Sequence, residues 1–169
     1  MERGVAHVPP GGGRTLWVLG ELVTYKVTSD QTSGAYSLFE VVSQPGGGPS
    51  PHVQHREDES FYVLEGEYEF LVEARTIRAD AGSLLYVPKG NLHVYRNVGE
   101  GTARMLVSQT PGGLHERFFE EVGVEVPDRR EPRGPERPES LARTREIAAG
   151  YGIEIPPPPE KQTRAKGSK

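Results

Sequence analysis

Hydrophobic residues between positions 15 and 110 come in short runs that are separated by turn-forming residues. The runs are rich in β-branched and aromatic residues and are about five to eight residues long, which is typical of strands. No segment in this part shows the 3.6-residue hydrophobic period of a helix. We therefore predict an all-β sandwich or barrel. The predicted strands are Thr15–Leu19, Leu22–Thr28, Tyr36–Ser43, Glu59–Leu64, Tyr68–Glu73, Thr76–Ala79, Ser83–Val87, Leu92–Asn97 and Ala103–Ser108.

The pattern changes after the last predicted strand, where two segments have helical spacing. Leu114–Val122 carries apolar residues on one helical face between Gly113 and Gly123, and Glu139–Ala149 forms the second predicted helix. The segment between them is charged and rich in proline, which is typical of an exposed linker. We predict a flexible N-terminus at residues 1–13, a barrel at 14–126, a linker at 127–138, a C-terminal helix segment at 139–155 and a disordered tail at 156–169.

Composition and charge narrow the classes of function. The chain has 21 glycines, 15 prolines and no cysteine, so disulfide scaffolds, cysteine zinc sites, iron–sulfur clusters and thiol nucleophiles are excluded. Residues 1–126 contain 10 Lys and Arg against 17 Asp and Glu, which argues against a nucleic-acid partner. The sequence has neither a long apolar run nor a signal-peptide pattern, so we expect a cytoplasmic protein without a membrane partner.

One segment concentrates residues that can hold a metal ion. His52, Gln54, His55 and Glu59 lie within eight residues, after a glycine- and proline-rich stretch. In a strand, His52 and Gln54 point to one face, whereas His55 points to the other unless a bulge intervenes. Glu59 opens the next predicted strand and can return a carboxylate to the same point. Such mixed nitrogen and oxygen donors suit first-row divalent metals, although a cluster of this kind is also typical of a solvated loop.

The spacing of these residues resembles the two motifs of the cupin superfamily, and in particular the small single-domain cupins that include quercetin-dioxygenase-like proteins. The first motif is matched by Pro51, His52, Gln54, Glu59 and Gly66. The second motif is matched by Gly82, Pro88, Gly90, His93 and Asn97. This resemblance implies a double-stranded β-helix, the cupin or jelly-roll barrel, with one or two short C-terminal helices.

The resemblance also implies a single divalent metal in the mouth of the barrel. The family's ligands carry over to His52, Glu59 and His93, but its remaining histidine falls on Gln54. Three alternatives follow: Gln54 binds the metal through its amide oxygen, His55 replaces it after a bulge, or the site is weak or empty. Strand alternation favours Gln54. An amide oxygen is a harder donor than imidazole, so zinc, manganese, iron, cobalt or nickel is favoured over copper.

Strand alternation extends the site into a pocket. If Glu59 and His93 point inward, so do Phe61 and Tyr95, and on the last predicted strand the apolar Met105 and Val107 are expected to face inward with them. An apolar cup around one metal is the usual form of a site for a small organic ligand. The competing interpretation of Phe61, Met105 and Val107 is plain core packing.

The resemblance implies a metal-dependent dioxygenase that acts on a phenolic or enolic, quercetin-like molecule, with Glu59 as the catalytic general base. Two alternatives stay open: a redox-inert metal cupin acting as an isomerase or polyketide cyclase, and a non-catalytic protein that binds a small molecule. We also expect a homodimer, because small cupins are often dimers. His115 opens a predicted helix and is expected at the surface.

Overall fold

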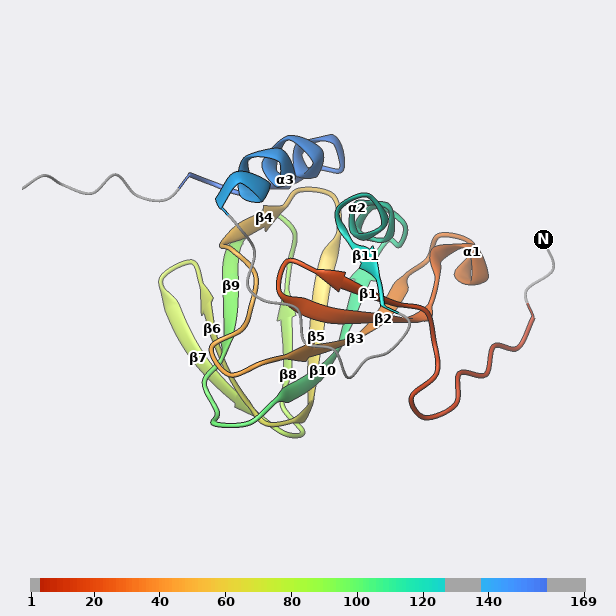
Figure 1. The fold of residues 1–169 in the computed structure, drawn as a ribbon, viewed down its shortest axis with the longest axis horizontal. Coiled ribbons are helices and arrows are strands. Elements are labelled where there is room, and N and C mark those ends of the chain that lie inside the picture. The colour runs from red at the N-terminus through yellow and green to blue at the C-terminus, as the bar shows by residue number, and fades with distance from the viewer. Residues whose placement is uncertain (1–3, 127–137, 158–169) are drawn as a thin grey trace, which may run out of the picture.

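The structure is a computed structural model of the chain that describes residues 4–126 and 138–157, with the side chains of residues 138–140 left aside. It consists of two antiparallel sheets that form a barrel, with α2 and α3 together at one end (Figure 1). The first sheet has the order β11 (Val124–Glu125), β1 (Thr15–Val18), β2 (Glu21–Val27), β3 (Ser37–Ser43), β10 (Ala103–Thr110), β5 (Asp58–Glu65) and β8 (Leu84–Val87). The second has the order β12 (Ile153–Glu154), β4 (His52–Gln54), β9 (Leu92–Asn97), β6 (Glu67–Val72) and β7 (Arg75–Asp80). The prediction of an all-β barrel is confirmed.

The period-two pattern of the sequence explains which side chains fill the barrel. Along β3, residues alternate strictly between buried and half-buried positions, and the same holds along β10 apart from its exposed last residue. Phe39, Phe70 and Met105 are completely buried and belong to one continuous apolar core between the two sheets. The expectation that Met105 and Val107 face inward is confirmed, since both are buried whereas their neighbours on β10 are half-buried.

Glycine is required at the turn between β5 and β6. Gly66 has a φ of 82°, and a Cβ atom at this position would lie 2.6 Å from the Cβ of Ala103. Both the left-handed backbone and the close approach exclude a larger residue without rearrangement. The first-motif glycine therefore has a structural explanation that is independent of any ligand.

The two predicted helices are present with nearly the expected bounds. They are α2 (Leu114–Val122) and α3 (Pro138–Gly150), and they pack on each other through a second apolar cluster that includes Phe118 and Ala148. The chain then forms β12, which pairs with β4 and places Ile153 opposite Gln54. The C-terminal segment thereby extends the second sheet at its β4 edge (Figure 1). Among the described helices, none is both long enough and apolar enough to span a lipid bilayer.

Four short elements were not predicted: the helix α1 (Ser29–Thr32) and the strands β4, β11 and β12. Each has two to four residues, too few to produce a recognisable hydrophobic period. The predicted linker at 127–138, except for Pro138, lies outside the described residues, as do residues 158–169 of the predicted tail. The predicted flexibility of residues 1–13 stays a prediction.

Candidate metal centre

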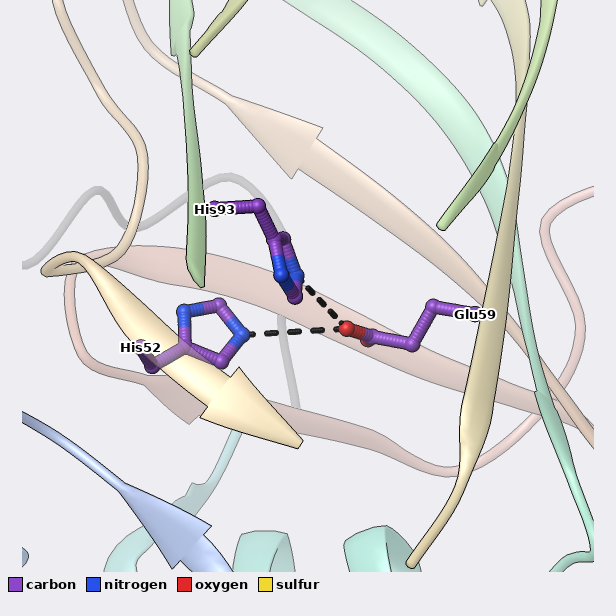
Figure 2. A group of neighbouring side chains, drawn as sticks. All are labelled: His52, Glu59 and His93. Carbon is purple, nitrogen blue, oxygen red and sulfur yellow. Dashed lines mark ion pairs between the residues drawn. The ribbon is translucent and has the colours of Figure 1, made fainter. Parts of the chain in front are cut away.

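Three strands bring His52, Glu59 and His93 together inside the barrel. His52 on β4 lies directly opposite His93 on β9, and Glu59 reaches them from β5 in the other sheet. The Nε2 atoms of His93 and His52 lie 2.7 and 3.8 Å from the Oε2 atom of Glu59. Figure 2 shows both imidazole rings directed toward this carboxylate. All three residues are buried, with exposed fractions of 8%, 3% and 1% for His52, Glu59 and His93.

The hydrogen bonds around this triad leave metal-binding atoms free. The Nδ1 atoms of His52 and His93 each lie 3.0 Å from a backbone carbonyl two residues earlier, that of Ser50 or Asn91. A carbonyl accepts only from a protonated Nδ1, so in the neutral rings both Nε2 atoms present lone pairs. Apart from their contacts within the triad, neither Glu59 Oε2 nor His93 Nε2 has a hydrogen-bond partner, although both are buried. These donors lie within 4.8 Å of one another and therefore fit a divalent metal ion.

Electrostatics within the triad agree with this geometry. Burial alone would raise the pKa of Glu59, but its contacts with His52 and His93 outweigh burial and hold this pKa well below its usual range. For His93, burial lowers the pKa, but the hydrogen bond and charge of Glu59, together with the hydrogen bond to the backbone of Asn91, outweigh burial and the pKa is raised. Glu59 is therefore a carboxylate at neutral pH, as a metal ligand must be.

Gln54 contacts a residue that the sequence interpretation placed elsewhere. Its side chain is buried, and its Nε2 atom lies 2.6 Å from Nδ1 of His115 in α2. The expectation that His115 is exposed is wrong: only 5% of this residue is exposed, and its ring packs against Phe119 with ring centroids 4.4 Å apart. Burial lowers the pKa of His115 to about 4, so its imidazole is neutral at pH 7. At the position where the first cupin motif has its other histidine, this chain thus has a buried glutamine that pairs with His115.

Glu57 explains why His115 is buried. This carboxylate, which sequence reasoning left unassigned, is 1% exposed and accepts hydrogen bonds from the backbone amides of Leu114 and His115. These amides belong to the N-terminus of α2, where a carboxylate is favoured by the free N–H groups. Burial nevertheless raises the pKa of Glu57 to about 7. Glu57 therefore holds the first turn of α2 over the triad.

The alternative ligand His55 lies outside the triad. Its side chain is 50% exposed, and its Nε2 atom forms an ion pair of 2.9 Å with Glu154 of β12. The backbone of His55 donates to Gly152, so this residue joins the C-terminal segment to the end of β4. No bulge turns the ring inward, and the geometry gives no support to His55 as a ligand.

One cavity begins at His52 and Glu59 and continues into the barrel. Of the predicted pocket residues, Phe61, Tyr95 and Val107 line it. Met105 does not: it pairs with Val63, one inward-facing layer farther from the triad than Val107, and is completely buried in the core. Sequence reasoning missed the residues that α2 and the C-terminal segment add to the lining, which are His115, Phe118, Phe119, Ile153 and Ile155.

A second carboxyl group lines this cavity. Glu21 is 5% exposed, and its Oε2 atom accepts a hydrogen bond of 2.6 Å from the hydroxyl of Tyr95. Its Oε1 atom accepts from Ser43, whose hydroxyl also accepts from Tyr68. Burial raises the pKa of Glu21 to about 7, partly offset by these hydrogen bonds. Sequence reasoning assigned no role to Glu21, and only its buried position among apolar residues distinguishes it.

This raised pKa predicts a pH-dependent stability. Because Glu21 binds its proton more tightly in the folded protein than at the ordinary value of 4.5, its contribution to stability is full below pH 4.5 and is lost as the pH rises toward 7. The free energy of unfolding of the wild type, minus that of Glu21→Gln, is expected to fall by about 3 kcal/mol over this interval. Urea titrations of both proteins at pH 4.5, 6 and 7.5, with metal chelated, measure it, and a constant difference would contradict the prediction. Other buried acids cancel in the comparison.

Comparison with known proteins agrees with the fold. Residues 39–108 match the family model described as the cupin domain. The chain carries a cupin domain. Within this domain lie both predicted motifs and all three residues of the triad. Cupins commonly bind a divalent metal, and this buried group is one that could hold it.

Individual relatives of this cupin have different names. A protein named polyketide synthase CurC from Streptomyces cyaneus is 37% identical over 87 residues, which cover 50% of this chain and 54% of that protein. Quercetin 2,3-dioxygenase from Bacillus subtilis (strain 168) is 26% identical over 113 residues, covering 67% of this chain and 33% of the enzyme. The chain thus spans about half or less of the length of these relatives. The polyketide cyclase RemF from Streptomyces resistomycificus has a TM-score of 0.55 at 20% identity, covering 63% of this chain and 80% of RemF, and shows the fold alone.

Proposed function

We propose that this cupin binds one divalent metal ion through His52, Glu59 and His93 and acts as a dioxygenase on a small phenolic or enolic molecule. The observation that carries the proposal is the pair of buried atoms Glu59 Oε2 and His93 Nε2, which contact each other but have no hydrogen-bond partner outside the triad, beside the end of a mainly apolar cavity that Glu59 lines. Burying such atoms without further partners is costly, and a bound cation would offset that cost.

The donor set indicates which metals suit the site. Two imidazole nitrogens and one carboxylate oxygen, with no sulfur in reach, favour iron, manganese, cobalt, nickel or zinc. Such an ion, when bound, supplies Lewis acidity that lowers the pKa of a phenolic hydroxyl and, if it is redox-active, electron transfer to dioxygen.

In the proposed reaction, Glu59 takes the proton of the substrate hydroxyl. Its Oε1 atom accepts a hydrogen bond of 3.1 Å from Gln109, which fixes the plane of the carboxylate, while Oε2 faces the imidazoles and the cavity. Proton transfer from the hydroxyl to Glu59 leaves an electron-rich phenolate or enolate, which is the form of the substrate that reacts with dioxygen. Phe61 and Val107 line the cavity beside it and keep the substrate away from water.

A second function is favoured by a specific observation. Gln54 occupies the place of a family histidine, and the relative named polyketide synthase CurC matches half of this chain at 37% identity. The same deprotonation by Glu59, without dioxygen, would support an isomerase or polyketide cyclase, in which the enolate carbon rather than dioxygen forms the new bond.

Oxygen consumption separates these functions. Protein loaded in turn with iron, manganese, cobalt, nickel or zinc is mixed with a flavonol or a polyhydroxylated polyketide, and dioxygen uptake and product mass are recorded. We expect uptake that matches substrate loss and that falls at least 100-fold in Glu59→Gln, in line with the roughly 10²–10⁴-fold effect of general bases. The His55→Ala variant serves as a control. Product of unchanged or dehydrated mass without uptake would overturn the dioxygenase in favour of the isomerase or cyclase, and binding without turnover would overturn both.

A further inference from the structure

Two carboxyl groups line the cavity, those of Glu59 and Glu21, and their backbones lie at opposite ends of the barrel wall. On β10, Gln109 pairs with Glu59, whereas Ala103 pairs with Ser43, the residue that holds Glu21. Six residues of an extended strand separate these two positions, which corresponds to about 20 Å of backbone. Glu59 and Glu21 nevertheless line the same cavity, because their side chains, like that of Tyr95, lie inside the barrel.

Glu21 retains acceptor capacity in this position. The described contacts give each of its oxygens one hydroxyl donor, from Ser43 or Tyr95, whereas a carboxylate oxygen can accept two hydrogen bonds. Arg96, the charged side chain that lowers the pKa of Glu21, donates instead to the backbone carbonyls of Pro49 and Tyr95. Glu21 is therefore a buried carboxyl group without a described ion pair, which is an expensive arrangement in a wall that is mainly apolar.

We propose that Glu21 binds a second hydroxyl group of the substrate, so that the cavity selects phenols or enols that carry polar groups at both ends. The proposal rests on the proposed function, because the first hydroxyl is the one that Glu59 deprotonates. The apolar residues between the two carboxyl groups, including Phe39, Phe61 and Val107, would contact the ring system of such a substrate. The raised pKa of Glu21 supports this role, since a carboxyl group that is partly protonated near pH 7 can either donate to or accept from a hydroxyl.

A purely structural role for Glu21 makes a different prediction. The network of Glu21, Ser43, Tyr68 and Tyr95 joins β2 and β3 of one sheet to β6 and β9 of the other. If this were its only purpose, Tyr68→Phe and Glu21→Gln would both lower stability, and neither would change the choice of ligand. Tyr68 belongs to the same network but donates to Ser43 rather than to Glu21 and does not line the cavity, so Tyr68→Phe is the matched control.

The test compares two flavonols, quercetin and 3-hydroxyflavone, which share the 3-hydroxyl group, whereas only quercetin carries further hydroxyl groups on its outer rings. Calorimetric titration of the metal-loaded full chain is expected to show at least tenfold tighter binding of quercetin, as a hydrogen bond to a charged group can provide. Glu21→Gln and Glu21→Leu should reduce this ratio to about one while 3-hydroxyflavone binds as before, and Tyr68→Phe should keep the wild-type ratio. Circular dichroism and metal analysis establish that each variant is folded and loaded.

The outcomes separate this inference from the proposed function. If both flavonols bind and the Glu21 variants keep the wild-type ratio, the role of Glu21 is overturned and the proposed function stands. If the variants lose the ratio but dioxygen is never consumed, the role of Glu21 stands and the dioxygenase does not. If the wild type binds neither flavonol, both are overturned.

Discussion

The His93→Ala variant is expected to lose stoichiometric metal binding. His93 is the most deeply buried residue of the triad, and its Nε2 atom lies 2.7 Å from Glu59 Oε2. Removing an outer-shell partner of a metal ligand commonly weakens binding about 10–100-fold, so loss of a ligand should weaken it by more than about 100-fold. Elemental analysis of the purified protein and calorimetric titration with manganese or zinc measure the effect.

A matched histidine provides the control. His55 is half-exposed and pairs with Glu154, so His55→Ala removes an imidazole near the same strand and should leave metal binding unchanged. The His93→Ala substitution also leaves the buried carboxylate of Glu59 without its closest contact, which by itself destabilises the fold. Glu59→Gln, which removes the charge of this carboxylate, is therefore measured in parallel to distinguish loss of a metal ligand from loss of the fold. If folded His93→Ala and Glu59→Gln bind metal as tightly as His55→Ala does, the triad is not the metal centre.

Local patterns were sufficient to predict the main strands, whereas the triad was predicted from the motif resemblance. Period-two alternation placed Phe61 and Tyr95 on the same faces as Glu59 and His93, and the structure has all four inside the barrel. This succeeds because the side-chain period of a strand is fixed by backbone geometry and needs no knowledge of the neighbouring strand. The spacing of His52 and Glu59 in the chain does not by itself bring them close, because they lie in strands of different sheets. Their proximity depends on how the segment between them turns, and the motif resemblance supplied that information.

The position of His115 could not be predicted in the same way. A helix shows which of its residues share a face but not which part of the protein covers that face. His115 is buried because Glu57 binds the first turn of α2 and because Phe118 belongs to the second apolar cluster, which joins α2 to the C-terminal segment. Both contacts join residues that are distant in the chain, so the pairing of His115 with Gln54 follows from tertiary structure alone.

A turn illustrates the same limit on a smaller scale. The two-residue connection between β6 and β7 lacks the Gly or Asn that is expected there, yet Glu73 adopts a left-handed φ of 52°. Its backbone amide donates to Leu92, and its side chain accepts from the amide of Leu92 at 2.7 Å. Contacts with β9 thus offset the local preference, and these contacts are invisible in the residues of the turn itself.

The Phe39→Ala variant is expected to be about 3–5 kcal/mol less stable than the wild type. Phe39 is completely buried in the barrel core, and its ring contacts Tyr25 of β2 and Phe119 of α2, with centroids 5.0 and 5.3 Å away. Alanine would leave a void that these neighbours cannot fill without moving, so the barrel loses packing and α2 loses its support. Urea denaturation followed by fluorescence and circular dichroism measures the change.

Leu84→Ala is the matched control for this prediction. Leu84 is equally apolar but 68% exposed on β8, so its truncation should change the free energy of unfolding by no more than about 0.5 kcal/mol. Because Phe39 also lines the cavity and supports α2 through Phe119, Phe39→Ala should weaken flavonol binding as well, which Leu84→Ala should not. Equal stability losses in the two variants would show that α2 and the barrel fold independently of this contact. The position of α2 over the triad would then need another explanation.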